Sequence, residues 1–258
     1  MLMSNEELKA KYDSMHKQGT TAWFSDGQEE RETILKMGEP WKDVEVLEIG
    51  CGEGELVAAL DRRGAFCVGI DYSHAAIKRA TERFDRCKFS CKNYKDAWNT
   101  GTSLTKAKLT FSRLVMQGVL EHLDNPFGEL QWMIERFKPK TVITSSPCFL
   151  NPRGIVWMTL DMLGAVMSKT DLHWIDPHNF EDWCKQEGYR LTMESCDYLW
   201  GNGIEMLQDL RQRIPLALKD GNISFEMDNL GSLLDWLAGN MGELSTDYGA
   251  TMVYRIDV

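Results

Sequence analysis

The chain has 258 residues, enough for one large domain or one domain with an inserted cap, and its 43% hydrophobic and 26% charged residues are typical of a folded globular protein. Its formal net charge of −10 disfavours a nucleic-acid partner, because proteins that grip a phosphate backbone present basic surfaces. No apolar run reaches the roughly 20 residues of a membrane-spanning helix and the polar start lacks the apolar segment of a signal peptide, so we expect a cytoplasmic protein with no membrane partner.

Seven cysteines are scattered through the chain, and their spacing indicates no structural metal or disulfide framework. Cys87 and Cys91 are four residues apart, but no second pair completes a zinc-binding pattern. The cysteines are therefore interpreted as reduced, mostly buried thiols, and the leading prediction includes no metal.

The predicted elements begin with a helical lead-in over residues 1–40, which we interpret as a lid segment. From residue 41 to 258, strand-like apolar runs alternate with helical patterns, which predicts an α/β domain with a parallel sheet and helices on both faces. Two helical insertions interrupt this alternation, at about residues 147–176 and 203–247. The predicted strands are residues 45–49, 66–70, 87–91, 113–116, 141–145, 189–197 and 250–258.

The turn after the first predicted strand, with glycines at 50, 52 and 54, is the expected ligand site. Ligands of open parallel sheets bind beyond the carboxyl ends of the strands, where glycine lets them approach the backbone closely. The G-x-G-x-G spacing and Glu55 at the helix start disfavour the pyrophosphate of NAD, because a carboxylate there would repel it. A cationic cofactor without phosphate fits better. S-adenosylmethionine is one, and Asp71 after the second strand is suited to its ribose hydroxyls.

Three segments resemble the motifs of class I S-adenosylmethionine-dependent methyltransferases of the ubiquinone-biosynthesis type: EIGCGEG from Glu48, GIDYS from Gly69 and VMQGVLEHLDNP from Val115. The resemblance covers about residues 44–200. It implies a Rossmann-like, doubly wound sheet of seven mostly parallel strands with an antiparallel last strand. The family often has Asp after strand three, where this chain offers Asn93. The cofactor contacts that the resemblance implies are Glu48, Gly50, Gly52, Gly54, Asp71, Tyr72, Asn93, Met116 and Gln117.

Two histidines are candidate general bases, because imidazole exchanges protons near neutral pH. His122 follows the fourth strand beside Glu121, and His173 precedes the helix that leads to the sixth strand. A minor alternative holds a divalent metal between Glu121, His122 and His173, which would resemble the metal-dependent small-RNA 2′-O-methyltransferases. That family has a glutamate three residues before Glu121, where this chain has Gly118.

The acceptor pocket is predicted to be roofed by the N-terminal segment and the two helical insertions. We expect a small-molecule acceptor, methylated on O, N or C, with Glu121, His16, Trp23 and Trp157 among its contacts. Two alternatives stay open beside the RNA methyltransferase: an inactive cofactor-binding partner and, less favoured by the glycine spacing, an NAD-dependent oxidoreductase. The sequence leaves the acceptor and the oligomeric state undetermined.

Overall fold

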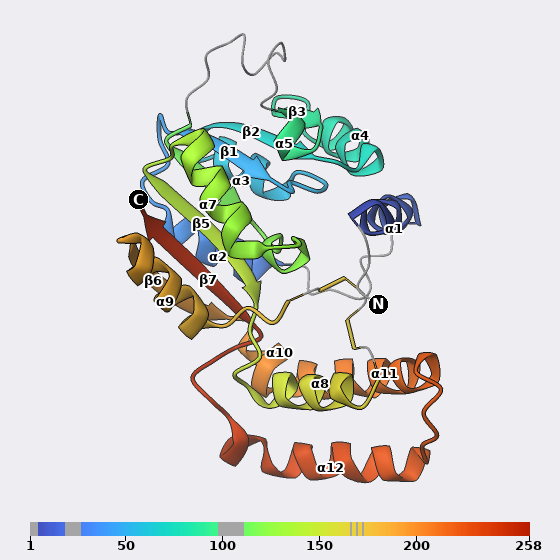
Figure 1. Ribbon diagram of the computed structural model, residues 1–258. Helices are drawn as coiled ribbons and strands as arrows, with labels where there is room; N and C mark the ends of the chain where they lie inside the picture. Colours follow the sequence, from blue (N-terminus) through green and yellow to red (C-terminus); the bar gives the residue numbers. More distant parts are fainter. Residues whose placement is uncertain (1–4, 19–26, 98–110, 166, 169, 172) are drawn as a thin grey trace.

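The computed structural model describes residues 5–18, 27–97, 111–165, 167–168, 170–171 and 173–258. Within these residues one sheet of seven strands has the order β3-β2-β1-β4-β5-β7-β6 (Figure 1). The five strands from β3 to β5 are parallel, whereas β7 runs antiparallel to both of its neighbours. The predicted sheet is confirmed. The strands are β1 (Glu45–Ile49), β2 (Phe66–Asp71), β3 (Lys88–Cys91), β4 (Arg113–Met116), β5 (Thr141–Pro147), β6 (Arg190–Cys196) and β7 (Thr251–Asp257).

Helices cover both faces of this sheet, because successive side chains of a strand point to opposite faces. In β1, Leu47 and Ile49 belong to the core under α7 and α9, whereas Val46 belongs to the core under α2 and α3. Glu48 shares the face of Val46 and is also buried. The covering helices are α2 (Gln28–Met37), α3 (Glu55–Asp61), α4 (His74–Arg83), α5 (Tyr94–Ala97), α7 (Pro126–Phe137) and α9 (Pro177–Glu187).

The helix ends follow local capping chemistry. Ser73 accepts a hydrogen bond from the backbone N–H of Ala76 at the start of α4, which satisfies a donor that has no partner within the helix. Asn125 and Asp176 cap α7 and α9 in the same way, each with a proline in the first turn. Gly188 ends α9 at a φ of 77°, a conformation in which glycine carries no steric penalty.

The two insertions meet in space and form a second, smaller core. Figure 1 shows α8, α11 and α12 stacked beside the sheet, with α10 between them and the strands. Their apolar residues pack in a cluster that includes Phe149, Trp157, Leu210 and Leu234. The single insertion predicted from residue 203 begins earlier and divides into three helices. The insertion helices are α8 (Pro152–Met162), α10 (Tyr198–Asn202), α11 (Ile204–Asp220) and α12 (Met227–Leu244).

In the predicted N-terminal lid segment, the two described helices lie in different places. Helix α2 packs on β5 and β7, where Ile34 and Leu35 are buried in the sheet core. Of these two helices, α1 (Asn5–Gln18) is the one that lies across the carboxyl-end side of the sheet, next to α4 (Figure 1). The apolar residues of α2 explain the difference, because a helix with a continuous apolar face is buried on the sheet. No helix of the described chain has the length and hydropathy needed to cross a membrane.

Candidate functional site

The glycine turn after β1 is tied to the end of β2 by the carboxylate of Asp71. The backbone N–H of Gly52 donates to one Asp71 oxygen at 3.0 Å, and the N–H of Ser73 donates to the other at 2.7 Å. Burial raises the pKa of Asp71 above its usual value, although these two backbone hydrogen bonds oppose the shift. Each carboxylate oxygen keeps a second lone pair, so Asp71 can still accept hydrogen bonds from a ligand.

Gly52 and Gly50 differ in the space around them. Both have positive φ, 50° and 73°, but a Cβ at Gly52 would meet no atom within 4 Å. A Cβ at Gly50 would lie 2.5 Å from a methyl carbon of Val119. Gly52 therefore opens a space in which a ligand can approach the backbone, whereas Gly50 permits close packing of the turn on the segment after β4.

Glu48 is a buried carboxylate with an unsatisfied oxygen. Its exposed fraction is 2%, and its Oε2 atom has no hydrogen-bond partner among the described residues. Burial raises the pKa of Glu48 well above its usual value, with further contributions from Glu55 and Asp71, while Arg31 opposes the shift. Such an orphaned acceptor fits a cationic ligand. Glu55, which we expected to repel an anionic ligand, instead pairs with Arg83.

Helix α1 joins this turn to the next part of the site. Asp13 accepts hydrogen bonds from the Ser73 hydroxyl at 3.0 Å and from the backbone of Ala75 at 3.1 Å, which holds α1 on the start of α4. One turn later, His16 contacts Glu53 of the glycine turn at 3.1 Å. His16 therefore lies on the cofactor side and not in the predicted acceptor pocket, and its role as a substrate contact stays a prediction.

A cavity of about 340 Å³ lies beyond the carboxyl ends of β4 and β5, which we call the sheet-end cavity. Tyr12 of α1, Gln117 after β4 and Pro147 at the end of β5 line one part of it. Arg153 and Trp157 of α8 line another part. The helical insertions therefore supply part of the wall of this cavity.

His122 lies in the wall of the sheet-end cavity with both ring nitrogens engaged. Its Nδ1 is 2.9 Å from the carbonyl oxygen of Thr170, which can only accept, so Nδ1 carries a proton. Burial lowers the pKa of His122, although Asp171 and the Thr170 carbonyl oppose the shift, and this favours the neutral imidazole. In that form Nε2 accepts the hydrogen bond from the Tyr12 hydroxyl at 2.8 Å. The one-turn 3₁₀-helix Leu120–His122 fixes the position of the ring.

Two carboxylates accompany His122, and the three side chains are able to hold a divalent cation. One potential ligand atom from each of Glu121, His122 and Asp171 lies within 4.8 Å of the others. Glu121 is 3% exposed and its Oε2 has no partner among the described residues. One imidazole and two carboxylates suit several divalent metals. The metal alternative is corrected in one respect, because Asp171 takes the position that we assigned to His173.

The other predicted cofactor contacts lie at the ends of the expected strands. Gln117 lines the sheet-end cavity and donates to Glu30 at 2.7 Å. The Met116 side chain is fully buried in the sheet core, so a ligand contact there would come from its backbone. Asn93 is exposed and its side chain accepts from the backbone of Lys95. Tyr72 packs edge-on against Tyr12 at a centroid distance of 6.4 Å.

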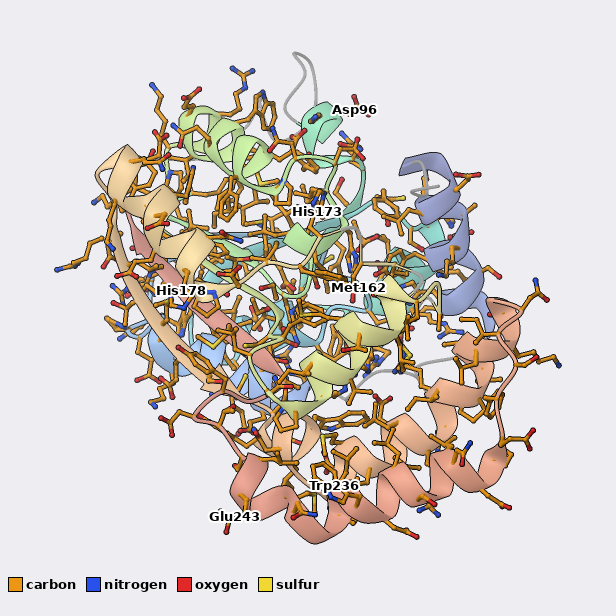
Figure 2. The ribbon with its side chains drawn as sticks, turned by 60° about the horizontal axis from the view of Figure 1, so that its bottom comes forward. Asp96, Met162, His173, His178, Trp236 and Glu243 are labelled. Carbon is orange, nitrogen blue, oxygen red and sulfur yellow. The ribbon has the colours of Figure 1, made fainter. Side chains whose placement is uncertain are left out.

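The predicted acceptor contacts are brought together only in part. Glu121 and Trp157 line the sheet-end cavity with His122, whereas His173 is not among its lining residues. Figure 2 labels both His173 and His178, and the latter is exposed in the first turn of α9. Trp23 lies outside the described residues. The cavity also contains Arg153, Arg213 and Asp171, which sequence reasoning missed because residues so far apart in the chain give no local pattern.

Comparisons with known proteins agree with this geometry. A family model described as a methyltransferase domain matches residues 17–194. Among curated proteins, a ubiquinone biosynthesis O-methyltransferase of Dinoroseobacter shibae is 26% identical over 151 residues, which cover 58% of this chain and 57% of the relative. One of Roseobacter denitrificans has the same identity and coverage. The chain thus spans less than two thirds of the length of these relatives.

Solved structures share the fold at low sequence identity. The magnesium protoporphyrin IX methyltransferase of Synechocystis, solved with bound S-adenosylhomocysteine, is 12% identical with a TM-score of 0.57, covering 98% of this chain and 99% of that one. The methyltransferase domain of a bacterial Hen1 protein is 17% identical with a TM-score of 0.52, covering 91% of this chain and all of that one. These likenesses confirm the fold, and the family match confirms the resemblance found in the sequence.

Proposed function

The protein belongs to the methyltransferase-domain family, and on this basis we propose that it transfers the methyl group of S-adenosylmethionine to a hydroxyl oxygen of a small molecule. The reaction is an in-line displacement in which the acceptor oxygen bonds to the methyl carbon as the carbon–sulfur bond breaks. The sulfur leaves as a neutral thioether, so the protein has to align the two reactants and remove the hydroxyl proton.

The observation that carries this proposal is the neutral imidazole of His122 in the wall of the sheet-end cavity. The Thr170 carbonyl holds the Nδ1 proton, which leaves the Nε2 lone pair directed to a hydroxyl, that of Tyr12. An acceptor hydroxyl that replaces Tyr12 would donate the same hydrogen bond to Nε2 and give its proton to that nitrogen as the new bond forms. A hydroxyl needs such a base at neutral pH, so this arrangement favours O-methylation.

The protein groups suited to bind the cofactor lie on the other side of α1 from His122. Asp71 has free lone pairs for the two ribose hydroxyls, and the open face of Gly52 admits the methionine portion close to the backbone. The orphaned oxygen of Glu48 suits the cationic groups of S-adenosylmethionine. Helix α1 would then close over the cofactor, because it is held by Asp13 at α4 and by Tyr12 at His122.

The alternatives have less support. A pyrophosphate would meet the buried Glu48 carboxylate, which disfavours NAD. A polynucleotide would meet a protein with a net charge of −10 and a cavity with acidic residues in its wall. An inactive cofactor-binding partner would not need a general base such as His122, whose imidazole is held in one orientation by hydrogen bonds at both ring nitrogens.

Calorimetric titration with S-adenosylmethionine, S-adenosylhomocysteine and NAD tests the cofactor. We expect both sulfur ligands to bind the wild type and to bind Asp71→Ala at least about tenfold more weakly, because hydrogen bonds to a charged group contribute about 1.5–3 kcal/mol each. Asp85→Ala, in the exposed turn after α4, is the control. Methyl transfer from labelled S-adenosylmethionine to a panel of phenols and alcohols then tests the reaction. Binding of NAD alone would refute the proposal.

A further inference from the structure

Arg153 stands out among the residues that line the sheet-end cavity, because its positive charge is nearly buried and only partly paired. Its side chain is 12% exposed, and its Nε donates to one oxygen of Asp209 at 3.0 Å. The second oxygen of Asp209 is paired with Arg213, whose Nε and Nη2 atoms lie 3.0 and 2.9 Å from it. Asp209 therefore divides its two oxygens between two guanidinium groups and cannot form a two-pronged pair with Arg153.

Both Nη groups of Arg153 remain without a hydrogen bond to any residue that the structure describes. Asp171 attracts the guanidinium electrostatically, but its carboxylate lies next to His122, at 3.6 Å from the imidazole Nδ1. A buried guanidinium with unused N–H donors is costly, because water no longer satisfies them. An oxyanion in the cavity would satisfy these donors and supply the missing negative charge.

Trp157 supplies a second, independent indication of the same kind. Its ring lies 4.1 Å from the guanidinium carbon of Arg153 and 4.8 Å from that of Arg213. The residue is 5% exposed, and its indole N–H has no acceptor among the described residues. Indole nitrogen can only donate, so this buried donor also lacks an acceptor atom. Unsatisfied donors from two residues of α8 thus occur at one wall of the sheet-end cavity.

We propose that this wall is an anion subsite and that the acceptor is a small carboxylic acid, whose carboxylate binds Arg153 and Trp157. The inference rests on the proposed function and adds the class of substrate. A carboxylate is planar and matches the paired N–H groups of a guanidinium edge. Glu30, Glu121 and Asp171 also line the cavity, so a singly charged carboxylate is accommodated better than a doubly charged phosphate.

The subsite also determines how the acceptor lies. Arg153 and Trp157 belong to α8, whereas His122 follows β4, so the carboxylate and the reacting hydroxyl are held by different elements. Asp209 and Arg213, which position Arg153, come from α11, beyond the residues 17–194 that match the methyltransferase family. The residues that position Arg153 therefore lie in a part of this chain that the family match does not cover, whereas Arg153 and Trp157 themselves lie within it.

Binding of benzoate, benzamide and inorganic phosphate tests the subsite without requiring turnover. Each probe is titrated into protein saturated with S-adenosylhomocysteine and into protein without it. We expect the wild type to bind benzoate at least about tenfold more tightly than either other probe, since benzamide lacks the charge and phosphate carries too much. Equal binding of benzoate and benzamide, no binding of benzoate, or a preference for phosphate would overturn the inference.

Variants assign the binding to the proposed residues. Arg153→Met should weaken benzoate about ten- to a hundredfold, and Trp157→Phe about threefold, with S-adenosylhomocysteine affinity unchanged in both. Arg213 stays on Asp209 in Arg153→Met, so we expect that variant to fold, and its melting temperature checks this. Arg190→Met is the matched control, because Arg190 pairs with Asp257 on the exposed sheet edge.

The two proposals fail in different ways. Unchanged benzoate binding in Arg153→Met, with intact S-adenosylhomocysteine binding, would overturn the subsite and leave the methyltransferase function standing. Loss of S-adenosylhomocysteine binding in Arg153→Met would also overturn it, because Arg153 would then hold the cofactor's own carboxylate. A wild type that binds neither sulfur ligand would refute the proposed function, while the benzoate titration without cofactor would still test the subsite.

Discussion

The glycine turn and the sheet-end cavity are built in different ways, although they lie on the same side of the sheet. The turn uses residues that are close in sequence, at the ends of β1 and β2, and most of its polar contacts involve backbone N–H groups and Asp71. The cavity collects side chains from α1, the segment after β4, α8, the segment before α9, and α11. A ligand common to a family can be held by a fixed backbone, whereas a particular acceptor needs side chains that can change independently.

The largest expected effect is a loss of turnover without a loss of cofactor binding, which would show that the sheet-end cavity and the glycine turn have different roles. Replacing His122 with Gln should reduce turnover about a hundred- to ten-thousandfold, the range for loss of a general base, while S-adenosylhomocysteine binds as before. Steady-state kinetics and calorimetry measure the two quantities. His178→Gln, on the exposed first turn of α9, is the control and should leave both unchanged. Equal loss of cofactor affinity in His122→Gln would show that the two regions are not separable.

Two alanine substitutions in the glycine turn should distinguish a glycine that admits the ligand from a glycine that permits packing. Gly52→Ala should weaken S-adenosylhomocysteine about tenfold or more, because its new methyl group enters open space at the turn. Gly50→Ala should instead lower the melting temperature, since its Cβ would lie 2.5 Å from Val119. Both variants carry the cost of a positive φ, about 1–2 kcal/mol, so the difference between them reports the surroundings. Identical behaviour would contradict this division.

The pH dependence of turnover should reflect the burial of His122. A neutral imidazole is the active base, so activity falls as pH drops through its pKa and is fully present above it. Because burial lowers that pKa, the acid limb should lie below about 6.5, the usual value for histidine. Asp171→Asn should move the limb to still lower pH, because Asp171 opposes the shift. A limb above the usual value would mean that another group is the base.

The smallest expected effect comes from metal removal. The base mechanism predicts that dialysis against a chelator changes turnover by less than about twofold, and that added magnesium or zinc does not raise it. Glu121, His122 and Asp171 could nevertheless hold a cation. Loss of activity on chelation, with recovery on adding one metal, would replace proton transfer to His122 with polarisation of the acceptor oxygen by the metal.

The sequence alone determined the sheet, the glycine turn and the class of cofactor. Periodic apolar runs act over a few residues, so the strands of the sheet were predicted to within two residues at either end. Asp71 could be assigned by a simple topological rule, because it ends β2, the strand adjacent to β1, on the same edge of the sheet as the glycine turn.

Only the tertiary structure decided which side chains face the acceptor. The tautomer of His122 depends on the Thr170 carbonyl, 48 residues further along the chain, and on Tyr12, 110 residues before it. Asp209 pairs with Arg213 four residues away on the same helix, but no local spacing predicts its pairing with Arg153, 56 residues earlier in the chain. Burial then determines which of these groups lack partners, because water satisfies exposed donors and acceptors but not those enclosed by packing of the insertions. The local sequence specifies the helices and strands, whereas their packing brings together the distant side chains that form the site.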